Sequence, residues 1–303
     1  MRALFWPFLF LFVAATVVQA ASPAREAPAP QRLRVLIIGA HPDDPDDTGG
    51  TAAKYVARGH EVKMISLTNG NAGHQSQGGG PLARRRAEEA RRAGAVIGAE
   101  YQVLDIADGE LMPTLENRRI LIRLIREFRP DIIFGPRPND YHPDHRYTAV
   151  LLQDAAYLVT VPNIEPQTPI LEKMPVIMYV SDSFQKPLPF RPDVAVDITD
   201  VVEKKLDMLD CHESQMYEWL PFNRGRLADV PGDKSARRAW LGETRKPVFA
   251  TEANLCRDAL TKLYGAERAA NIKFAEGFEC SEYGSPLTPE NLKILFPFFE
   301  RRP

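Results

Sequence analysis

Short runs of β-branched and other apolar residues alternate along the chain with longer segments in which apolar residues recur at helical spacing. The alternation begins near residue 34 and is typical of consecutive βαβ units. Such units build a mostly parallel sheet that is covered by helices on both faces. The sequence therefore predicts an α/β fold with a Rossmann-like, mostly parallel sheet. Strands are expected at 34–40, 61–67, 101–106, 131–136 and 175–181, and helices at 51–59, 82–98 and 115–130.

The N-terminus has the composition of an export signal. Arg2 is followed by an apolar run over 3–18, which leads to the small residue Ala20. An uncleaved membrane anchor is the alternative, but the run is shorter than the ~20 residues of a comfortable span. We therefore expect an exported protein, periplasmic or extracellular, with no stable membrane span after cleavage. The expected parts are a signal peptide over 1–20, a flexible Ala- and Pro-rich leader over 21–32 and a folded domain over 33–303.

Composition excludes some classes of protein and partner. The chain has 303 residues and a formal net charge of −2, which does not suggest a nucleic-acid partner. Its three cysteines, Cys211, Cys256 and Cys280, are too few and too widely spaced for a disulfide framework or a thiolate zinc cluster. In an exported protein one pair could still be bridged, and the sequence does not say which.

Two clusters of histidine and aspartate follow two of the expected strands. HPDD, from His41 to Asp44, ends the first strand, and NDYHPDH, at 139–145, follows the strand at 131–136. Ligands of open α/β sheets bind beyond the carboxyl ends of the strands, so the two clusters are expected to converge. His41 and Asp44 are spaced to reach one ion, and a ligand from 139–145 would complete a set of two histidines and one carboxylate. Three protein ligands with one open position are typical of catalytic zinc.

Each cluster, taken singly, has a structural alternative. An acidic loop at a helix entry is often only solvated, and Asp46 or Asp47 would be favoured there by the helix N-terminus. Crowded carboxylates, however, repel one another unless a cation, hydrogen bonds or solvent compensate their charge. Two His-Pro-Asp stretches behind two separate strands therefore favour the metal site.

With these motifs the chain resembles the zinc-dependent de-N-acetylases of the LmbE-like, or GlcNAc-phosphatidylinositol deacetylase (PIG-L), superfamily. The resemblance is carried by AHPDD after the first strand, TNGNAGH after the second, RAEEARRAGAVIG, and HPDH at 142–145. It continues through 192–215 and 274–298, so it covers nearly all of the expected domain. The paired HPDD and HPDH in this order are highly specific.

The resemblance implies a role for each matching residue. Asp43 would be the general base, His142 would assist at the carbonyl oxygen or the leaving amine, and Asp144 would orient its neighbours. Arg86 aligns with an arginine that is implicated in substrate binding. The implied metal is zinc, with ferrous iron as the alternative, and its implied ligands are His41, Asp44 and His145.

Two further histidines are candidates for the substrate site, and one stretch departs from the family. His74 lies in the loop after the second strand, where a solvated histidine is the alternative, and His212 lies on an expected helix, where a structural histidine is the alternative. PDDTGG, directly after HPDD, is one residue shorter than the family pattern and has Asp47 where an apolar residue is common. The pocket beside this turn is therefore expected to differ in shape from the family's.

The expected activity is removal of acetyl from an N-acetylated amino sugar of the N-acetylglucosamine type, with release of acetate. Export favours an envelope or extracellular glycan as the source of this substrate. A carbohydrate-binding protein without turnover is one alternative, which would be more credible had Asp43 been replaced. A non-heme iron oxygenase is the other, since two histidines and a carboxylate also ligate iron in that class.

Overall fold

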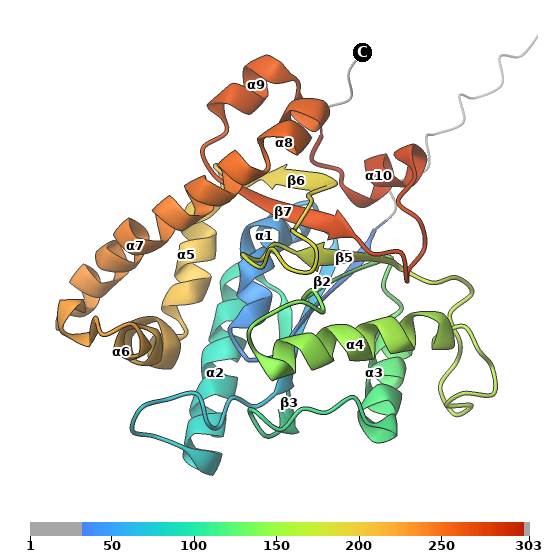
Figure 1. Cartoon of the computed structure of the whole chain (residues 1–303), viewed down its shortest axis with the longest axis horizontal. Coiled ribbons are helices and arrows are strands. Elements are labelled where there is room, and N and C mark those ends of the chain that lie inside the picture. The colour runs from blue at the N-terminus through green and yellow to red at the C-terminus, as the bar shows by residue number, and fades with distance from the viewer. Residues whose placement is uncertain (1–31, 300–303) are drawn as a thin grey trace, which may run out of the picture. The chain divides into compact units, whose positions relative to one another are not determined.

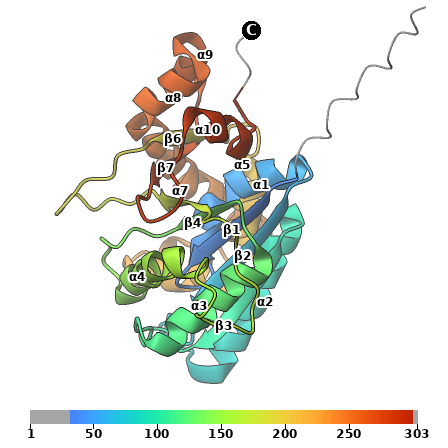
Figure 2. The ribbon, with the colours of Figure 1, turned by 90° about the vertical axis from the view of Figure 1, so that its right-hand side faces the viewer.

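The computed structural model describes residues 32–299 and shows one mixed sheet with helices on both faces (Figures 1 and 2). The strand order is β3-β2-β1-β4-β5-β7-β6. Neighbours among the first five strands of this order pair in parallel, whereas β7 runs antiparallel to both β5 and β6. The predicted α/β class is confirmed. The strands are β1 (Arg34–Gly39), β2 (Glu61–Thr68), β3 (Glu100–Ile106), β4 (Ile132–Gly135), β5 (Val176–Val180), β6 (Val194–Asp197) and β7 (Ala275–Cys280).

The two faces of the sheet are buried by different helices, as the alternation of β1 shows. Val35 and Ile37 belong to a core that includes residues of α1, α2 and α10, and Leu36 and Ile38 belong to a core with α3 and α4. β1 is therefore buried on both sides, which explains its continuous apolar sequence. The helices and helical turns are α1 (Gly49–Ala57), α2 (Gly79–Ile97), α3 (Leu115–Phe128), α4 (Pro143–Leu158), α5 (Val202–Asp210), α6 (Leu220–Asn223), α7 (Lys234–Leu255), α8 (Arg257–Tyr264), α9 (Ala266–Asn271), α10 (Pro289–Leu295), η1 (Asp44–Thr48), η2 (Ser214–Trp219) and η3 (Leu227–Asp229).

The sequence prediction located β1 to β5 but missed the antiparallel edge. β6 has four residues, and β7 contains Glu276 and Gly277, so neither has a run of β-branched residues. The helix expected at 82–98 begins three residues earlier, since α2 starts at Gly79. The predicted stop of this helix at Gly98 is confirmed, because Gly98 adopts the left-handed conformation with φ of 80°.

A buried ion pair between α5 and β7 also holds the start of α1. Lys205 Nζ lies 2.7 Å from Glu276 Oε1, and both side chains are 2% exposed. The Glu276 carboxylate also accepts hydrogen bonds from Gly50 N (2.9 Å) and Thr51 N (2.7 Å), and Lys205 Nζ donates to the Asp47 carbonyl oxygen (2.6 Å). Since α1 starts directly after HPDD and η1, this pair fixes the backbone behind the first polar cluster.

The C-terminal end of the described chain packs on the domain. Phe296 and Phe298 are buried in the core that includes α1. The predicted signal peptide, and the leader up to residue 31, lie outside the described residues. Between residues 32 and 299 no helix combines the length and the apolar character needed to cross a bilayer. The three cysteines are all free thiols.

Candidate metal and active site

The first half of the site is the turn that follows β1. Asp44 Oδ2 accepts hydrogen bonds from Ala40 N (2.9 Å) and His41 N (2.7 Å), so the carboxylate is folded back over the end of the strand. Gly39 lies directly under this turn, where an added Cβ would lie 2.6 Å from Asp44 Cβ. Residue 39 must therefore be glycine for the turn to close in this way.

The second half comes from the loop after β4 and the first turn of α4. His142 is the N-cap of α4, and its side chain accepts a hydrogen bond from Asp144 N (3.2 Å). His145 follows one helical turn later and points back at the turn after β1. The two clusters converge as the sequence predicted: His145 Nε2 lies 3.2 Å from His41 Nδ1 and 3.3 Å from Asp44 Oδ2.

The three atoms that meet here have the spacing of a metal-ligand set. His41 Nδ1 lies 3.3 Å from Asp44 Oδ2, so all three pairs of atoms are separated by 3.2 or 3.3 Å. Zinc ligands at about 2.0–2.2 Å in tetrahedral geometry lie roughly 3.3 Å from one another. Two imidazole nitrogens and one carboxylate oxygen also suit ferrous iron. His41, Asp44 and His145 thus fit a catalytic metal in both geometry and donor chemistry.

The other ring nitrogen of each histidine faces a carboxylate. His145 Nδ1 lies 2.9 Å from Asp140 Oδ1, and His41 Nε2 lies 3.2 Å from Asp108 Oδ1 and 3.3 Å from Asp144 Oδ2. Carboxylates in these positions orient metal-binding imidazoles and select their tautomer. Sequence reasoning gave no role to Asp108 or Asp140. The only signals were the position of Asp108 just after a strand and of Asp140 within NDYHPDH.

A second group of possible ligands shares His41. His41, Asp108 and Asp144 also offer ligand atoms within 4.8 Å of one another, as do His41, His142 and His145. Asp144, however, is fully buried and accepts hydrogen bonds from Gly109 N (2.7 Å) and Leu111 N (3.3 Å). Asp144 is therefore committed to holding the loop after β3, which fits the predicted orienting role better than a ligand role.

Asp44 and the histidines control each other's charge. Burial lowers the pKa of His145, but Asp44 and Asp140 outweigh it and raise this pKa to about 10. Burial opposes the charge of Asp44, yet His145 and His41 hold the pKa of this carboxyl well below its usual value. A histidine must be neutral to bind a metal, so metal binding at neutral pH displaces the proton of His145.

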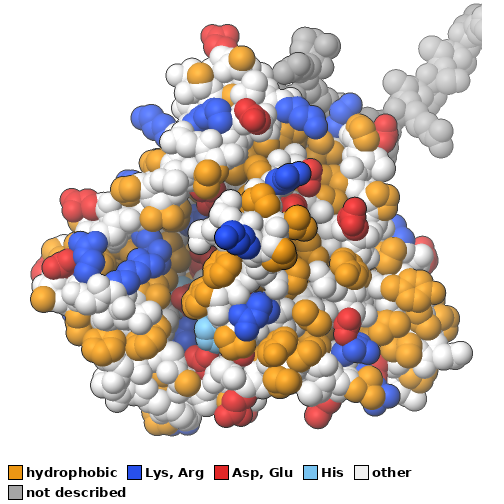
Figure 3. All heavy atoms as spheres, in the orientation of Figure 1, with side chains coloured by type: hydrophobic (Ala, Val, Ile, Leu, Met, Phe, Trp, Pro, Cys, Tyr) orange, Lys and Arg blue, Asp and Glu red, His pale blue; other side chains and the backbone are white. Residues whose placement is uncertain are grey.

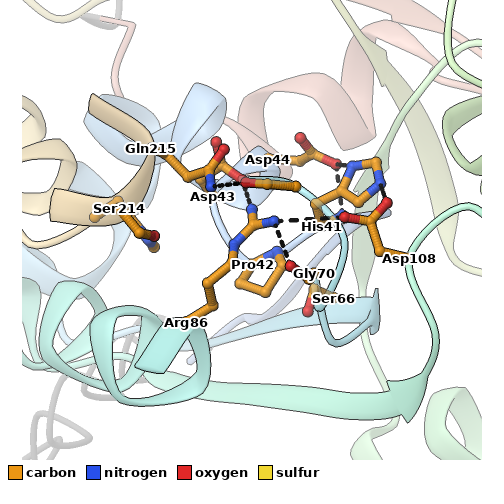
Figure 4. Close-up of polar contacts among 12 residues, drawn as sticks. His41, Pro42, Asp43, Asp44, Ser66, Gly70, Arg86, Asp108, Ser214 and Gln215 are labelled. Carbon is orange, nitrogen blue, oxygen red and sulfur yellow. Dashed lines mark hydrogen bonds and ion pairs between the residues drawn. The ribbon is translucent and has the colours of Figure 1, made fainter. Parts of the chain in front are cut away.

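Asp43 lies beside this set and is held by Arg86. The Arg86 Nη2 atom lies 2.6 Å from Asp43 Oδ1, its Nη1 atom donates to the Gly70 carbonyl oxygen (3.2 Å), and the side chain is only 2% exposed (Figure 4). Arg86 also lies 3.7 Å from Asp108, so one buried guanidinium connects the carboxylates on either side of it. Arg86 is placed to orient Asp43, while Asp43 itself lines the cavity described next.

A cavity of about 350 Å³ opens beside the metal-ligand set. Asp43, Asp44 and His145 form one part of its wall, and other parts come from β5, α5, α7, β7 and the loops after β4 and β5. Figure 3 shows histidine and carboxylate atoms inside a hollow on this face of the molecule. The volume is within the range of about 300–1,000 Å³ that is common for small-molecule sites.

Of the remaining predicted site residues, His142 lies at the metal-ligand set, whereas His74 and His212 do not line the cavity. The His142 ring is half-buried and packs edge-on against His41, with 4.5 Å between ring centroids. His74 is bonded to Glu218 (2.7 Å) and His212 to Asp46 (3.1 Å), and neither lines the cavity. The structure thus brings His142 to the metal-ligand set but leaves His74 and His212 in supporting contacts behind it, which agrees with the structural alternative for His212.

The part of the chain that carries both His-Pro-Asp stretches matches a known family. The family described as "PIG-L: GlcNAc-PI de-N-acetylase" matches residues 36–156, which include both His-Pro-Asp stretches. Diacetylchitobiose deacetylase from Thermococcus kodakarensis is 34% identical over 63% of this chain and 75% of its own length. The chain belongs to the PIG-L family.

Two further similar proteins show how much of the chain the similarity covers. The structure of N,N'-diacetylchitobiose deacetylase from Pyrococcus horikoshii has a TM-score of 0.60 and 26% identity, covering 82% of this chain and 84% of the other. 4-Oxalmesaconate hydratase from Pseudomonas putida is 25% identical over 75% of this chain and 90% of its own length. Because relatives of this protein include both deacetylases and a hydratase, the family alone does not fix the reaction.

The buried His212–Asp46 pair predicts a pH-dependent stability. Burial lowers the pKa of His212, but Asp46, with smaller effects of Asp43 and Glu89, outweighs burial, and the net pKa lies above the usual value. The pair therefore stabilises the fold fully below about pH 6.5, and this contribution is lost as pH rises through the raised pKa. We expect His212→Gln to lower the free energy of unfolding more at pH 6 than at pH 9, as measured by urea denaturation. Asp46→Asn should remove the same pH dependence, and an equal cost at both pH values would contradict the assignment.

Proposed function

We propose that this protein is a metal-dependent hydrolase that removes acetyl from an N-acetylated amino sugar and releases acetate. The observation that supports this most strongly is the triangle of His41 Nδ1, Asp44 Oδ2 and His145 Nε2, with sides of 3.2–3.3 Å, at the wall of a cavity that also contains Asp43. The deacetylase relatives support the same reaction. The net change is the cleavage of one amide C–N bond by water, which gives a free amine and acetate.

A zinc or ferrous ion held by His41, Asp44 and His145 would polarise the amide carbonyl and lower the pKa of water. Asp43 would take the proton of the attacking water, since Arg86 orients its carboxylate (2.6 Å). The same proton would then pass to the departing nitrogen. Asp43 thus has the role of the base, and Arg86 acts through it as a positioning residue.

His142 would stabilise charge at the carbonyl oxygen. Its Nδ1 atom accepts from Asp144 N, so the neutral ring carries its hydrogen on Nε2. Burial, His41 and His145 all lower the pKa of His142, which favours this neutral form at pH 7. His142 would therefore present an N–H donor to the oxygen or to the leaving amine.

We further propose that the chain is exported. The support is the sequence of residues 1–20 alone, a single arginine, an apolar run and a small residue at position 20. N-terminal sequencing of the protein from a bacterial expression host should then find Ala21 as the first residue. A secreted or membrane-bound product that begins at Met1 would contradict cleavage.

Acetate release is the test of the proposed reaction. We expect zinc-reconstituted protein to release acetate from at least one member of a panel of free, conjugated and oligomeric N-acetylglucosamine compounds. A chelator should abolish the release, and added zinc should restore it. If metal-bound protein releases no acetate from any compound, the proposal is contradicted. That result would favour a carbohydrate-binding protein without turnover, or a hydratase such as the relative from Pseudomonas putida.

Two variants separate the base from the ligands. Asp43→Asn should keep bound zinc but lose about 10²–10⁴-fold in kcat, because proton transfer is lost. His145→Ala should lose zinc affinity as well as activity, because it removes one of three ligands. Zinc content by mass spectrometry of the native protein and kcat on the best substrate measure both effects. Asp229→Asn, on an exposed turn outside the site, is the matched control; equal zinc loss in Asp43→Asn and His145→Ala would contradict the division of roles.

A further inference from the structure

Most charged side chains on the cavity wall are paired with an opposite charge. Arg137 Nη1 lies 3.0 Å from Asp182 Oδ2, and Lys205 pairs with Glu276 at 2.7 Å. Asp43 pairs with the buried Arg86 behind the wall. Such pairs satisfy one another and leave little charge for a ligand to meet.

Asp47 on η1 is one exception. It lies on the cavity wall, and it is exposed there, unlike the other residues of η1. Lys205 donates to its backbone carbonyl oxygen at 2.6 Å, but among residues 32–299 its carboxylate has no hydrogen bond or ion pair. The turn that departs from the family pattern thus presents to the cavity an acceptor that no group of the described chain occupies.

Glu252 of α7 also lines the wall without an ion pair, but its Oε1 atom accepts hydrogen bonds from Ser181 Oγ (2.5 Å) and Gly277 N (2.9 Å). Arg245 on the same helix is the second charged group there that no charged or strong polar group of the described chain satisfies. Its guanidinium lines the same cavity and is half-buried, and its one hydrogen bond in the described part of the chain runs from Nη2 to Met216 Sδ (3.1 Å). A thioether is a weak acceptor, so most of the five N–H donors of Arg245 remain available. No carboxylate of the described chain pairs with it, although Asp47 and Asp43 are close enough to oppose the effect of burial on its pKa.

A carboxylate can only accept hydrogen bonds and a guanidinium can only donate them. A sugar hydroxyl does both, so adjacent hydroxyls satisfy Asp47 and Arg245 together without adding charge. A carboxylate on the ligand would bind Arg245 but face Asp47, and an ammonium would bind Asp47 but face Arg245. We propose that Asp47 and Arg245 form a subsite for the hydroxyl groups of a neutral sugar, which makes the enzyme discriminate against acidic amino sugars. This subsite would make neutral amino sugars the substrate class of the proposed deacetylase. It depends on the proposed function for the reaction, but not for the binding of the sugar.

The test compares acidic sugars with uncharged compounds of the same size. N-acetylglucosaminuronic acid and N-acetylmuramic acid are each paired with the corresponding amide, and KM and kcat for acetate release are measured with the zinc-loaded full chain. The wild type should prefer both amides over both acids. Arg245→Gln should raise KM for the amides about tenfold with little change in kcat, because a charge-assisted hydrogen bond to bound substrate is lost. Arg245→Lys should restore part of this loss.

Asp47→Asn gives the sharper readout. It removes the repulsion of a ligand carboxylate but keeps the size of the side chain, so the preference for amide over acid should fall about tenfold. If Asp47 had a purely structural role, Asp47→Asn would weaken the binding of acids and amides alike. Asp229→Asn and Arg226→Gln, an exposed pair with 2.8 Å between Arg226 Nε and Asp229 Oδ2, are the matched controls and should leave the preference unchanged.

Binding is measured separately from turnover, by calorimetry on Asp43→Asn protein with the same four sugars. If the amides bind better than the acids but the wild type releases no acetate, the proposed reaction fails and the subsite stands. The subsite is overturned if the wild type prefers the acids, if Asp47→Asn and Arg245→Gln change acids and amides equally, or if none of the four sugars binds.

Discussion

Negative charge at the carboxyl edge of the sheet is the constraint on which the rest of this structure depends. Asp43, Asp44 and Asp46 lie within four consecutive residues shortly after β1, and the Glu276 carboxylate of β7 reaches the start of α1 that follows them. Each of these carboxylates has its own compensating partner: Arg86 for Asp43, His41 and His145 for Asp44, His212 for Asp46, and Lys205 for Glu276. Apart from His41, which lies in the same turn, the partners come from α2, α4, α5 and the turn after α5, so charge compensation assembles elements that are far apart in the sequence.

This arrangement also explains how the roles of neighbouring aspartates diverge. Asp43 and Asp44 are adjacent, but a buried guanidinium holds the first and two imidazoles face the second. Asp43 lines the cavity wall, where we propose that it acts as the base, while Ala40 N and His41 N fix Asp44 in the position proposed for a metal ligand. Environment, rather than residue type, would therefore separate the proposed base from the proposed ligand.

Much of the fold and the meeting of the two His-Pro-Asp clusters could be predicted from the sequence, because local sequence patterns determine them. The apolar run of β1, the stop of α2 at Gly98 and the convergence of HPDD with HPDH follow from hydrophobic periodicity, glycine conformation and the geometry of parallel sheets. β6 and β7 were missed because long-range pairing, not local preference, makes them strands. Asp108 and Asp140 were missed because an aspartate that orients a histidine has no spacing rule of its own. His74 was placed near the substrate by its loop position and His212 by a family pattern, and neither signal reports which side chain reaches the cavity. The ligand roles of His41, Asp44 and His145 stay a prediction that the geometry supports.

The position of the metal tests the central claim most directly. Crystals of the zinc-loaded full chain, measured by anomalous diffraction at the zinc absorption edge, should show one strong peak bounded by His41 Nδ1, Asp44 Oδ2 and His145 Nε2, with the remaining coordination position open to the cavity. A peak on the other side of His41, between Asp108 and Asp144, or zinc bound only elsewhere on the protein, would contradict the proposed catalytic site.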